Sequence, residues 1–500
     1  MLSLLFLSPI AQVNIPIDRP PIVQPSIAPQ DVTAPRRSLS LPLPPQEPSQ
    51  PPLPKLQKQE QIRRQEVRAL LGQIDQVPVF NSNSPEVVLT EGILLSTFSP
   101  NGMAVPAAHL NYAFNGRFDI FSHHISRAGH GSHLRTLFQG ILLHNPGDTP
   151  AVVEVMQAST YLTRPDALFV DLPKVVEDPL GRVFSGPGSR VVGDVLRGHR
   201  NPAIARTLTI PPKTTQVLLN MPIPAGVTTP TSNGRSTLMR LNVDQPIHVA
   251  NLAMFAPQEG GRERVPTLEE WQNLLVKGEL AGPRDRPPTP LDNGNPNLIY
   301  GRVAGVSTGS QWTTQLVDGN TQTLAIPSQG EAFSYGISLL HNGRFGTGQI
   351  QSAPLLARYP DTAYAGNGNY GVQYNLTLPL HNKTNQPQTI SLSLDTPVKQ
   401  DKVNNLLLFL SPPEPRIFFR GPVRIRYHDN NGVQQTRYFH IVQRRGEQGA
   451  SLLDLRLGPN ESRSIEVNVV YPPDATPPQL LTITTQGGSG AIAEQITQKP

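Results

Sequence analysis

Four histidines close together in the chain are the residues best suited to bind a metal ion. They are His123, His124, His130 and His133 in the stretch HHISRAGHGSH, with Asp119 just before them. Neutral imidazoles in a compact loop can bind zinc, copper or nickel. Adjacent side chains on a strand point to opposite faces, so His123 and His124 cannot both bind one ion from regular strand geometry. We therefore expect a polar loop with exposed histidines, no metal site and no cofactor.

Four tyrosines in the C-terminal half could contact a ligand. They are Tyr359, Tyr364, Tyr370 and Tyr374. Exposed tyrosine rings stack on sugar rings or fill protein interfaces, whereas packing within a sheet is the more frequent fate. The sequence leaves both interpretations open and makes these four the candidate ligand-binding aromatics.

Carboxylate pairs are the remaining catalytic possibility. Glycoside hydrolysis requires two acids about 5 to 10 Å apart. Asp119, Glu154, Asp361 and Asp474 are available, but nothing in the sequence marks any pair of them. A hydrolase acting on cell-wall or extracellular polysaccharide is therefore an alternative and not the main hypothesis.

Two glycine-containing motifs lie in the wrong context for chemistry. Residues 366–371 fit the dinucleotide pattern G-x-G-x-x-G, yet residues 372–378 alternate like a strand instead of forming the helix that this pattern requires. Residues 305–309 fit the nucleophile elbow G-x-S-x-G, yet residues 311–317 resemble a second strand. We expect no catalytic residue and no cofactor-binding residue.

Strands must position these side chains. Short alternating runs such as 372–378, 389–394 and 465–470 are separated by Gly, Pro, Asn and Asp. Period-two alternation is typical of half-buried antiparallel strands, and many such runs indicate sandwiches or barrels. With 54 prolines and only 16% charged residues, the 500-residue chain cannot be mostly helical. The predicted fold class is all-β.

Three landmarks recur in the same order and suggest an internal duplication. The pairs are Asn115–Phe118 with Asn342–Phe345, Leu142–Asn145 with Pro379–Asn382, and Ile210–Thr215 with Leu457–Ser462. Each set combines strands, an Asn-containing turn and a proline. We therefore predict two related, immunoglobulin-like β-sandwich halves joined by a short helix and a Pro-rich linker.

The clearest helix is predicted over residues 267–278. Thr267 can cap it, Glu269 and Glu270 suit the helix dipole, and Gly278 can end it. Apolar residues at helical spacing form one stripe that must dock against another element. The stripe consists of Leu268, Trp271, Leu274 and Leu275.

The N-terminal region differs in composition from the body. Residues 1–11 form an apolar run that resembles either a truncated secretory signal or only a hydrophobic end, and it is too short to span a bilayer. We predict no transmembrane span.

The chain is predicted to have two β-rich domains, the first at 78–265 and the second at 298–485, joined by a helix and linker at 266–297. Before the first domain we expect the possible signal segment at 1–11, a Pro-rich disordered spacer at 12–56, and a short basic helix and connection at 57–77. A flexible tail at 486–500 is expected to follow the second domain.

Composition excludes further classes. The chain has no cysteine, so disulfides, thiolate metal sites and a thiol nucleophile are excluded. A formal net charge of +5 is too weak a field to indicate a nucleic-acid partner.

Long strings in the body resemble a family of exported cyanobacterial proteins catalogued only as a domain of unknown function. The resemblance extends over about residues 77–484. It implies cyanobacterial origin and export, and it brings no assigned activity or site. The strings that carry it are Pro78–Asn81, Glu91–Ser96, Gly116–His124, Ala253–Pro257, Pro266–Trp271, Ala281–Arg286, Tyr300–Gly305, Arg358–Tyr364 and Tyr471–Pro478.

These observations favour a non-catalytic protein of the periplasm or cell surface. We expect a structural or binding module whose partner is a cell-wall glycan, an exopolysaccharide or another envelope protein.

Overall fold

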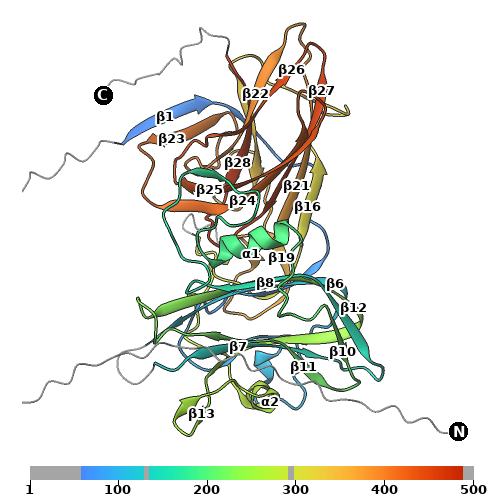
Figure 1. Cartoon of the computed structure of the whole chain (residues 1–500), viewed down its shortest axis with the longest axis vertical. Coiled ribbons are helices and arrows are strands. Elements are labelled where there is room, and N and C mark those ends of the chain that lie inside the picture. Colours follow the sequence, from blue (N-terminus) through green and yellow to red (C-terminus); the bar gives the residue numbers. More distant parts are fainter. Residues whose placement is uncertain (1–57, 129–133, 291–297, 488–500) are drawn as a thin grey trace, which may run out of the picture. The chain divides into compact units, whose positions relative to one another are not determined.

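The computed structural model describes residues 58–128, 134–290 and 298–487. In these ranges 28 strands accompany two α-helices and one short 3-10 helix, η1 (Pro106–Ala108) (Figure 1). The all-β prediction is therefore confirmed, and most strands form two β-sandwiches. No helix in the described ranges is long and apolar enough to cross a membrane.

The first sandwich is built around one long strand, β12 (Ser232–Phe255). A register shift between Val243 and Ile247 bends β12, so that its two halves belong to facing sheets. One sheet has the order β10 (Thr207–Ile210), β8 (Ala151–Leu162), β12, β6 (Phe114–Arg127), β3 (Pro78–Ser82), β15 (Ala304–Thr308), β19 (Ala353–Arg358) and β20 (Ala365–Gly366), with β4 (Val87–Val88) beside β6. In the facing sheet, β12 pairs with β5 (Gly92–Ser96) and with β7 (Leu137–His144), which also pairs with β11 (Thr215–Ile223).

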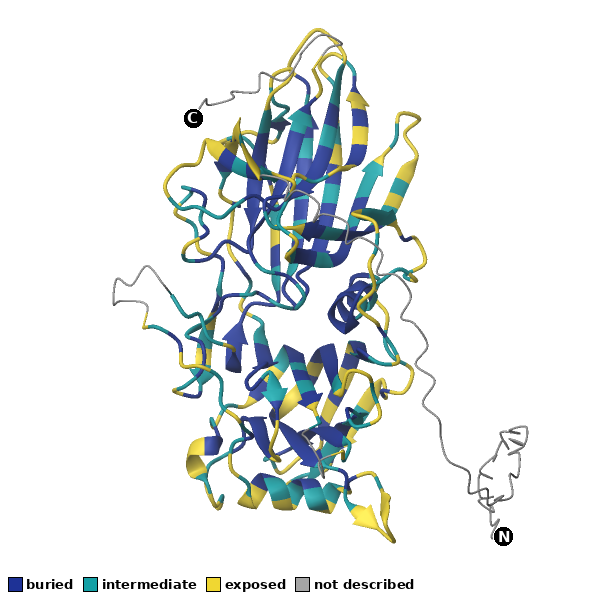
Figure 2. Cartoon of the chain, turned by 90° about the vertical axis from the view of Figure 1, so that its left-hand side faces the viewer, coloured by how far each residue is buried: buried dark blue, intermediate teal, exposed yellow. Residues whose placement is uncertain are grey.

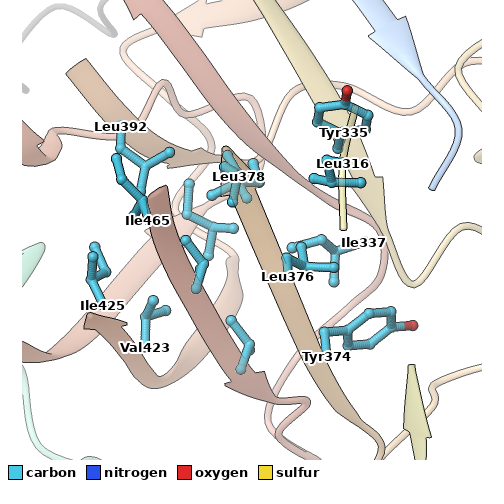
Figure 3. Packing of buried hydrophobic residues seen from close by; sticks show 14 of the residues in the cluster. Leu316, Tyr335, Ile337, Tyr374, Leu376, Leu378, Leu392, Val423, Ile425 and Ile465 are labelled. Carbon is cyan, nitrogen blue, oxygen red and sulfur yellow. The ribbon is translucent and has the colours of Figure 1, made fainter. Parts of the chain in front are cut away.

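The second sandwich has two separate sheets. One contains β16 (Gln311–Gln315), β21 (Gln373–His381), β27 (Ser462–Val470), β24 (Ile417–His428), β25 (Gln434–Arg444) and β9 (Val175–Glu177), with β17 (Leu324–Ala325) beside β21. The other has the order β2 (Glu66–Arg68), β18 (Ala332–Ile337), β28 (Gln479–Thr485), β22 (Gln388–Asp395) and β26 (Ser451–Leu457). Alternate residues of β21, such as Leu376 and Leu378, meet Leu392 and Ile465 in the core between the sheets (Figure 3). Two further pairs of strands are β1 (Gln59–Arg64) with β23 (Leu406–Ser411), and β13 (Gln258–Glu259) with β14 (Arg262–Glu263).

The sandwiches exchange strands, which corrects the predicted boundary at residues 297/298. β15, β19 and β20 follow that boundary in sequence but lie in the first sandwich, whereas β9 precedes it and lies in the second. All five residues of β15 are buried, and its backbone pairs with β3 on one edge and β19 on the other. Hydrophobic patterning identifies strands but does not identify their partners, which is why the boundary was placed wrongly.

The predicted basic helix at 57–77 is also wrong. The structure has β1 and β2 in this segment, and their partners are β23 and β18 of the second sandwich. Ile62 is 62% exposed while Val67 is 1% exposed, so the apolar residues form no helical stripe. Tertiary pairing outweighs the local helix propensity of this charged segment.

The helix predicted at 267–278 is confirmed as α2 (Leu268–Lys277). Thr267 accepts a hydrogen bond from the Glu270 amide, and the Glu270 carboxylate accepts one from the Thr267 amide. Trp271 packs so closely on β7 that a Cβ at Gly140 would lie 2.6 Å from its indole ring. The predicted apolar stripe therefore docks on the first sandwich.

A second helix, α1 (Pro187–Leu196), was not predicted. Pro187, Gly188 and Gly193 have low helix propensity and obscure the helical pattern. The helix lies between the two sandwiches and is buried along most of its length (Figures 1 and 2). Its valines pack against Phe121 of the first sandwich and Val470 of the second.

Two buried asparagines occupy the same position at a corner of each sandwich. Asn145 follows β7, and its Nδ2 donates to the carbonyl oxygens of Thr149 and Ile210 at 2.7 and 3.0 Å. Its Oδ1 accepts from the Gly147 amide at 2.9 Å. The side chain thus joins a tight turn to the end of β10.

Asn382 follows β21 and makes the corresponding bonds. Its Nδ2 donates to the carbonyl oxygens of Gln386 at 2.8 Å and Gly458 at 2.8 Å, and its Oδ1 accepts from the Thr384 amide at 3.0 Å. Leu457, the last residue of β26, also receives a bond from Nδ2, at 3.3 Å. Both asparagines are 0% exposed, and each side-chain amide uses its nitrogen and its oxygen in hydrogen bonds within the sandwich.

Candidate functional site: a polar cavity between the sandwiches

A cavity of about 280 Å³ lies where the two sandwiches meet. Such a volume is near the lower end for small-molecule sites, which span about 300–1,000 Å³. The first sandwich contributes side chains from the end of β3, from the loop that follows it and from β6. Polar and aromatic residues dominate the lining, which includes Asn81, Asn83, Glu86, His123, Tyr300, Arg302, Asn367, Asn369, Tyr370 and Lys399.

The acidic group of the cavity, Glu86, shares an arginine partner with a second carboxylate. Arg302 donates to the Glu86 carboxylate and also to Asp285 Oδ1, the latter at 3.1 Å. His123 Nε2 lies 3.9 Å from Glu86 Oε1, and His123 Nδ1 lies 2.8 Å from Ser236 Oγ. Burial lowers the pKa of His123, so its imidazole is neutral at pH 7.

Two tyrosines of the cavity keep their protons. Burial raises the pKa of both Tyr300 and Tyr370 to about 12. The Tyr370 hydroxyl donates to the Ala475 carbonyl oxygen at 3.1 Å, and its ring stacks on Tyr471 with centroids 6.4 Å apart. The Tyr300 hydroxyl donates to the His341 carbonyl oxygen. Both phenols are fixed in place by these bonds.

Three polar groups of the cavity have no partner among the described residues. The buried Oδ1 atoms of Asn81 and Asn83 accept no hydrogen bond from any of them. The Lys399 ammonium forms no ion pair with a described carboxylate, and burial, aided by the charge of Arg445, lowers its pKa to about 8. The two amide oxygens are buried away from solvent, and Lys399 is half-buried. These three groups therefore do not by themselves form a ligand site.

The histidines singled out by the sequence do not form an exposed loop. β6 continues to Arg127 and carries both His123 and His124, which corrects that expectation. His124 is 0% exposed, its Nε2 lies 2.9 Å from Ser82 Oγ, and its Nδ1 lies 2.8 Å from the Pro85 carbonyl oxygen. Burial lowers its pKa to about 3. His130 and His133 lie outside the described residues.

No metal cluster is present in the part of the chain that the structure describes: no three His, Cys, Asp or Glu side chains there are arranged to hold an ion. Asp119 is buried in ion pairs with Arg117 and Arg240 and accepts a hydrogen bond from Ser310. Its carboxylate therefore serves the packing of the two sandwiches.

The four tyrosines have different environments. Tyr359 and Tyr374 are buried, with hydroxyls bonded to the Ala108 carbonyl oxygen and to Asn369 Nδ2, so neither ring can stack on a ligand. Tyr364 is half-buried beneath the Arg358 guanidinium group, 4.0 Å from its ring centroid. Among these four, Tyr370 alone lines the cavity. Tyr374 lies in β21, whereas Tyr359 and Tyr364 lie in the connection between β19 and β20.

Two of the three remaining candidate carboxylates, Asp361 and Glu154, are paired with arginines. Asp361 accepts two hydrogen bonds from Arg284, and Glu154 lies on the exposed face of β8, 3.9 Å from Arg206. Asp474 Oδ2 accepts from the Ser189 amide at 3.3 Å, and burial raises the pKa of Asp474 to about 7.

The two glycine motifs lie in strand contexts, as expected. Ser307 is buried within β15, and residues 366–371 lead into β21 without a helix. Neither segment has the strand-to-helix geometry that its motif requires.

Sequence reasoning missed Asn81, Asn83, Glu86, Arg302 and Lys399. The run of polar residues NSNS at 81–84, directly after the apolar Val79 and Phe80, was the available signal. Arg302 and Lys399 are far from it in sequence, and only the strand exchange brings them together.

The fold and the cavity define a protein of two strand-exchanged β-sandwiches with a polar cavity between them. The chain belongs to the family described as protein of unknown function (DUF3370), whose model matches residues 65–485. The resemblance found in the sequence is confirmed to that extent.

Comparisons with other proteins add no function. No curated protein matches the chain. Two globulins of solved structure align at 11% identity and a TM-score of 0.09: the 11S globulin procruciferin from Brassica napus, over 83% of this chain and 86% of that one, and pumpkin seed globulin, over 80% and 86%. Likeness at this level supports no argument about fold or function.

Proposed function

We propose that this protein is a non-catalytic binding protein whose cavity between the sandwiches holds a glycan. The observation that carries the proposal is a cavity of about 280 Å³ lined by amide, hydroxyl and charged side chains, among them Asn83, Asn367 and Tyr370. Sugar hydroxyls both donate and accept hydrogen bonds, so side chains of these types can bind them.

The test is retention on isolated polysaccharide. Purified protein is incubated with peptidoglycan and with exopolysaccharide, and the bound fraction is compared with that of Asn83→Ala. We expect retention that falls about tenfold in the variant, because one lost hydrogen bond with its desolvated partner is worth about 1–2 kcal/mol. Retention on neither polymer, or equal retention of the variant, contradicts the proposal.

A polysaccharide hydrolase is the second candidate, and one observation favours it. The pKa of Asp474 is raised to about 7, chiefly by burial and in part by the charge of Glu86, while Glu86 is paired with Arg302. Two carboxyl groups in different environments are the usual acid and base of glycosidases. Product analysis of the same incubations distinguishes the candidates: new reducing ends that disappear in Asp474→Asn identify a hydrolase, and intact polymer identifies a binding protein.

We propose that the protein acts in the periplasm or at the cell surface of a cyanobacterium. The proposal is supported by the resemblance to exported proteins and by the apolar run at 1–11, which lies outside the described residues. The Pro-rich segment that follows is suited to act as a spacer. Cell fractionation that places the unprocessed protein with cytoplasmic markers contradicts this location.

We also propose that the two sandwiches arose by duplication. The Asn145 and Asn382 corners support the proposal, because each connects a strand, a four-residue turn and the end of a later strand with the same atoms. In each sandwich the histidine that precedes the corner asparagine is hydrogen-bonded to the first residue of a neighbouring strand. His144 is bonded to Thr215, which begins β11, and His381 is bonded to Ser462, which begins β27. Separate alignment of the two halves across the family tests the idea, which fails if the corner asparagines do not align.

A further inference from the structure

Strand β1 has one edge that no described strand covers. It pairs only with β23, and Figure 1 shows the two strands together at the periphery of the second sandwich. In the same register, the Gln65 amide donates to the Asn405 carbonyl oxygen at 3.0 Å. Residues that bond to the partner alternate along an antiparallel strand, so the backbone groups of Glu60, Ile62 and Arg64 point away from β23. Such an open row of donors and acceptors is a template for another strand.

The side chains on one face of the β1–β23 pair are apolar and exposed. Ile62 lies opposite Leu408, and it is 62% exposed. Together with Leu406, which is 36% exposed, these two residues line an open groove of about 610 Å³. The alternate residues of β23, Leu407 and Phe409, are buried on the other face. An exposed isoleucine on an uncovered edge strand marks a surface suited to pairing with a further strand.

The charges of β1 are self-complementary. Glu60 and Arg64 flank Ile62 at equal spacing, both are exposed, and neither forms an ion pair with another described residue. If a second copy of β1 pairs antiparallel about a two-fold axis at Ile62, Glu60 of each copy lies opposite Arg64 of the other. Moving that axis by one residue places Arg64 opposite Lys58 in one direction, and Glu60 opposite Glu66 in the other. Like charges in opposite positions destabilise a strand pair, so the charges select the axis at Ile62.

We infer that two copies of this chain associate through their β1 strands, which pair antiparallel and continue the β1–β23 sheet across a two-fold axis. This inference is independent of the proposed function. The strand pair forms about six backbone hydrogen bonds, because the outward-facing groups of Glu60, Ile62 and Arg64 meet those of Arg64, Ile62 and Glu60 in the other copy. It also brings the two exposed isoleucines together. A single pair of short strands is a small interface, so the dimer is reversible.

A second edge strand, β26, is less suited to this pairing. It ends the other sheet of the second sandwich and carries Asp454 and Arg456 on its exposed face. Asp454 already accepts hydrogen bonds from Ser391, Ser451 and Gln486. Its carboxylate is therefore used within the chain, and Arg456 serves as a control position.

Sedimentation equilibrium of the full chain at pH 7 and low salt measures the association. Glu60→Arg and Arg64→Glu are each expected to weaken the dimer about tenfold or more, because two opposite-charge pairs become two like-charge pairs. An equimolar mixture of these two variants is expected to restore association, since positions 60 and 64 of one variant then face the opposite charge in the other. Restoration also shows that both variants are folded. Arg456→Glu makes the same charge change on β26 and should leave the dimer unchanged.

A disulfide locates the contact at one residue. The chain has no cysteine, so a single introduced thiol can pair only with the same thiol of another copy. Directly opposite residues of a hydrogen-bonded pair have Cα atoms about 5.5 Å apart, which a disulfide can bridge. Ile62→Cys should form a covalent dimer on mild oxidation. Val433→Cys, at a position that is 54% exposed, should remain largely monomeric and serves as the control.

Four results would overturn the inference. A full chain that stays monomeric at every concentration tested shows that the edge has another occupant, either a different protein or residues 1–57 of the chain. A dimer that Glu60→Arg leaves intact, or that Arg456→Glu weakens equally, is not held by β1. Failure of the mixed variants to associate contradicts the register. Equal cross-linking of Ile62→Cys and Val433→Cys shows random collision.

Discussion

Asn145 and Asn382 at the strand corners use both ends of their amide groups, whereas Asn81 and Asn83 in the cavity leave their amide oxygens unpaired. All four side chains are buried. Bonding within the protein makes the corner amides part of the fold, because they replace backbone partners that the turns do not supply. The oxygens of the cavity amides form no such bond with the described residues, so these two side chains contribute less to holding the fold together.

The largest expected effect on stability concerns His124, a buried side chain whose two ring nitrogens both have hydrogen-bond partners. Its pKa is about 3 in the folded protein, against about 6.5 when unfolded, so the unfolded chain binds an extra proton between these values. The contribution of His124 to the free energy of unfolding is complete above pH 6.5 and falls as the pH drops, by about 1.4 kcal/mol per pH unit. Urea unfolding at pH 7, 6, 5 and 4 measures this slope of the free energy of unfolding against pH. His124→Asn should be less stable at pH 7 and show a shallower slope, while an unchanged slope would show that other groups cause the acid sensitivity.

At the corners, Asn382→Ala should reduce the free energy of unfolding by about 2–3 kcal/mol, because carbonyl oxygens of the turn and of β26 lose their donor. Asn145→Ala should cost a similar amount. The neighbouring exposed Asn385→Ala provides the matched control and should change stability by less than about 0.5 kcal/mol. Denaturant unfolding measures all three variants. Equal losses of stability in Asn382→Ala and Asn385→Ala would show that the corner hydrogen bonds do not stabilise the fold.

The corners and the cavity also differ in how far the sequence predicts them. The motifs ending at Asn145 and Asn382 are local and recur, so they could be recognised from residue order alone. α2 could be predicted for the same reason, since its capping box lies within four residues. The cavity could not, because its walls combine residues near 81–86 with residues near 300 and 400. Those walls meet because β15, β19 and β20 join the first sandwich across the predicted domain boundary, and pairing between distant strands leaves no local pattern.

On the cavity side, Lys399→Met should raise stability at pH 7 by about 1 kcal/mol, because it removes a half-buried charge that partial desolvation and the nearby Arg445 disfavour. The folded pKa of Lys399 is about 8 and the unfolded value is 10.5, so the unfolded chain binds more protons between them. The original protein should therefore gain stability as the pH rises from 8 to 10.5, and the gain should be smaller in the variant. Thermal unfolding in this range measures it, with Lys402→Met as the control, and a less stable Lys399→Met would show that the lysine has a partner.

The smallest stability effect is expected for Asn83→Ala. Its Oδ1 accepts nothing from the described residues, so removal should change the free energy of unfolding by less than about 1 kcal/mol. Denaturant unfolding measures this next to Asn382→Ala. A loss as large as that at the corner would mean that Asn83 supports the fold and is not reserved for a ligand.

Hydrogen–deuterium exchange with and without bound polysaccharide tests the central claim, that the cavity between the sandwiches is the binding site, most directly. We expect slower exchange in peptides covering residues 81–86, 300–303 and 366–370, and no change at the corners 145–149 and 382–386. The groove lined by Arg64, Arg68 and Phe333 is the internal comparison, since it is larger, about 760 Å³, and lies on the second sandwich. Protection confined to that groove, or absent from all three cavity segments while the polysaccharide is bound, would contradict the account.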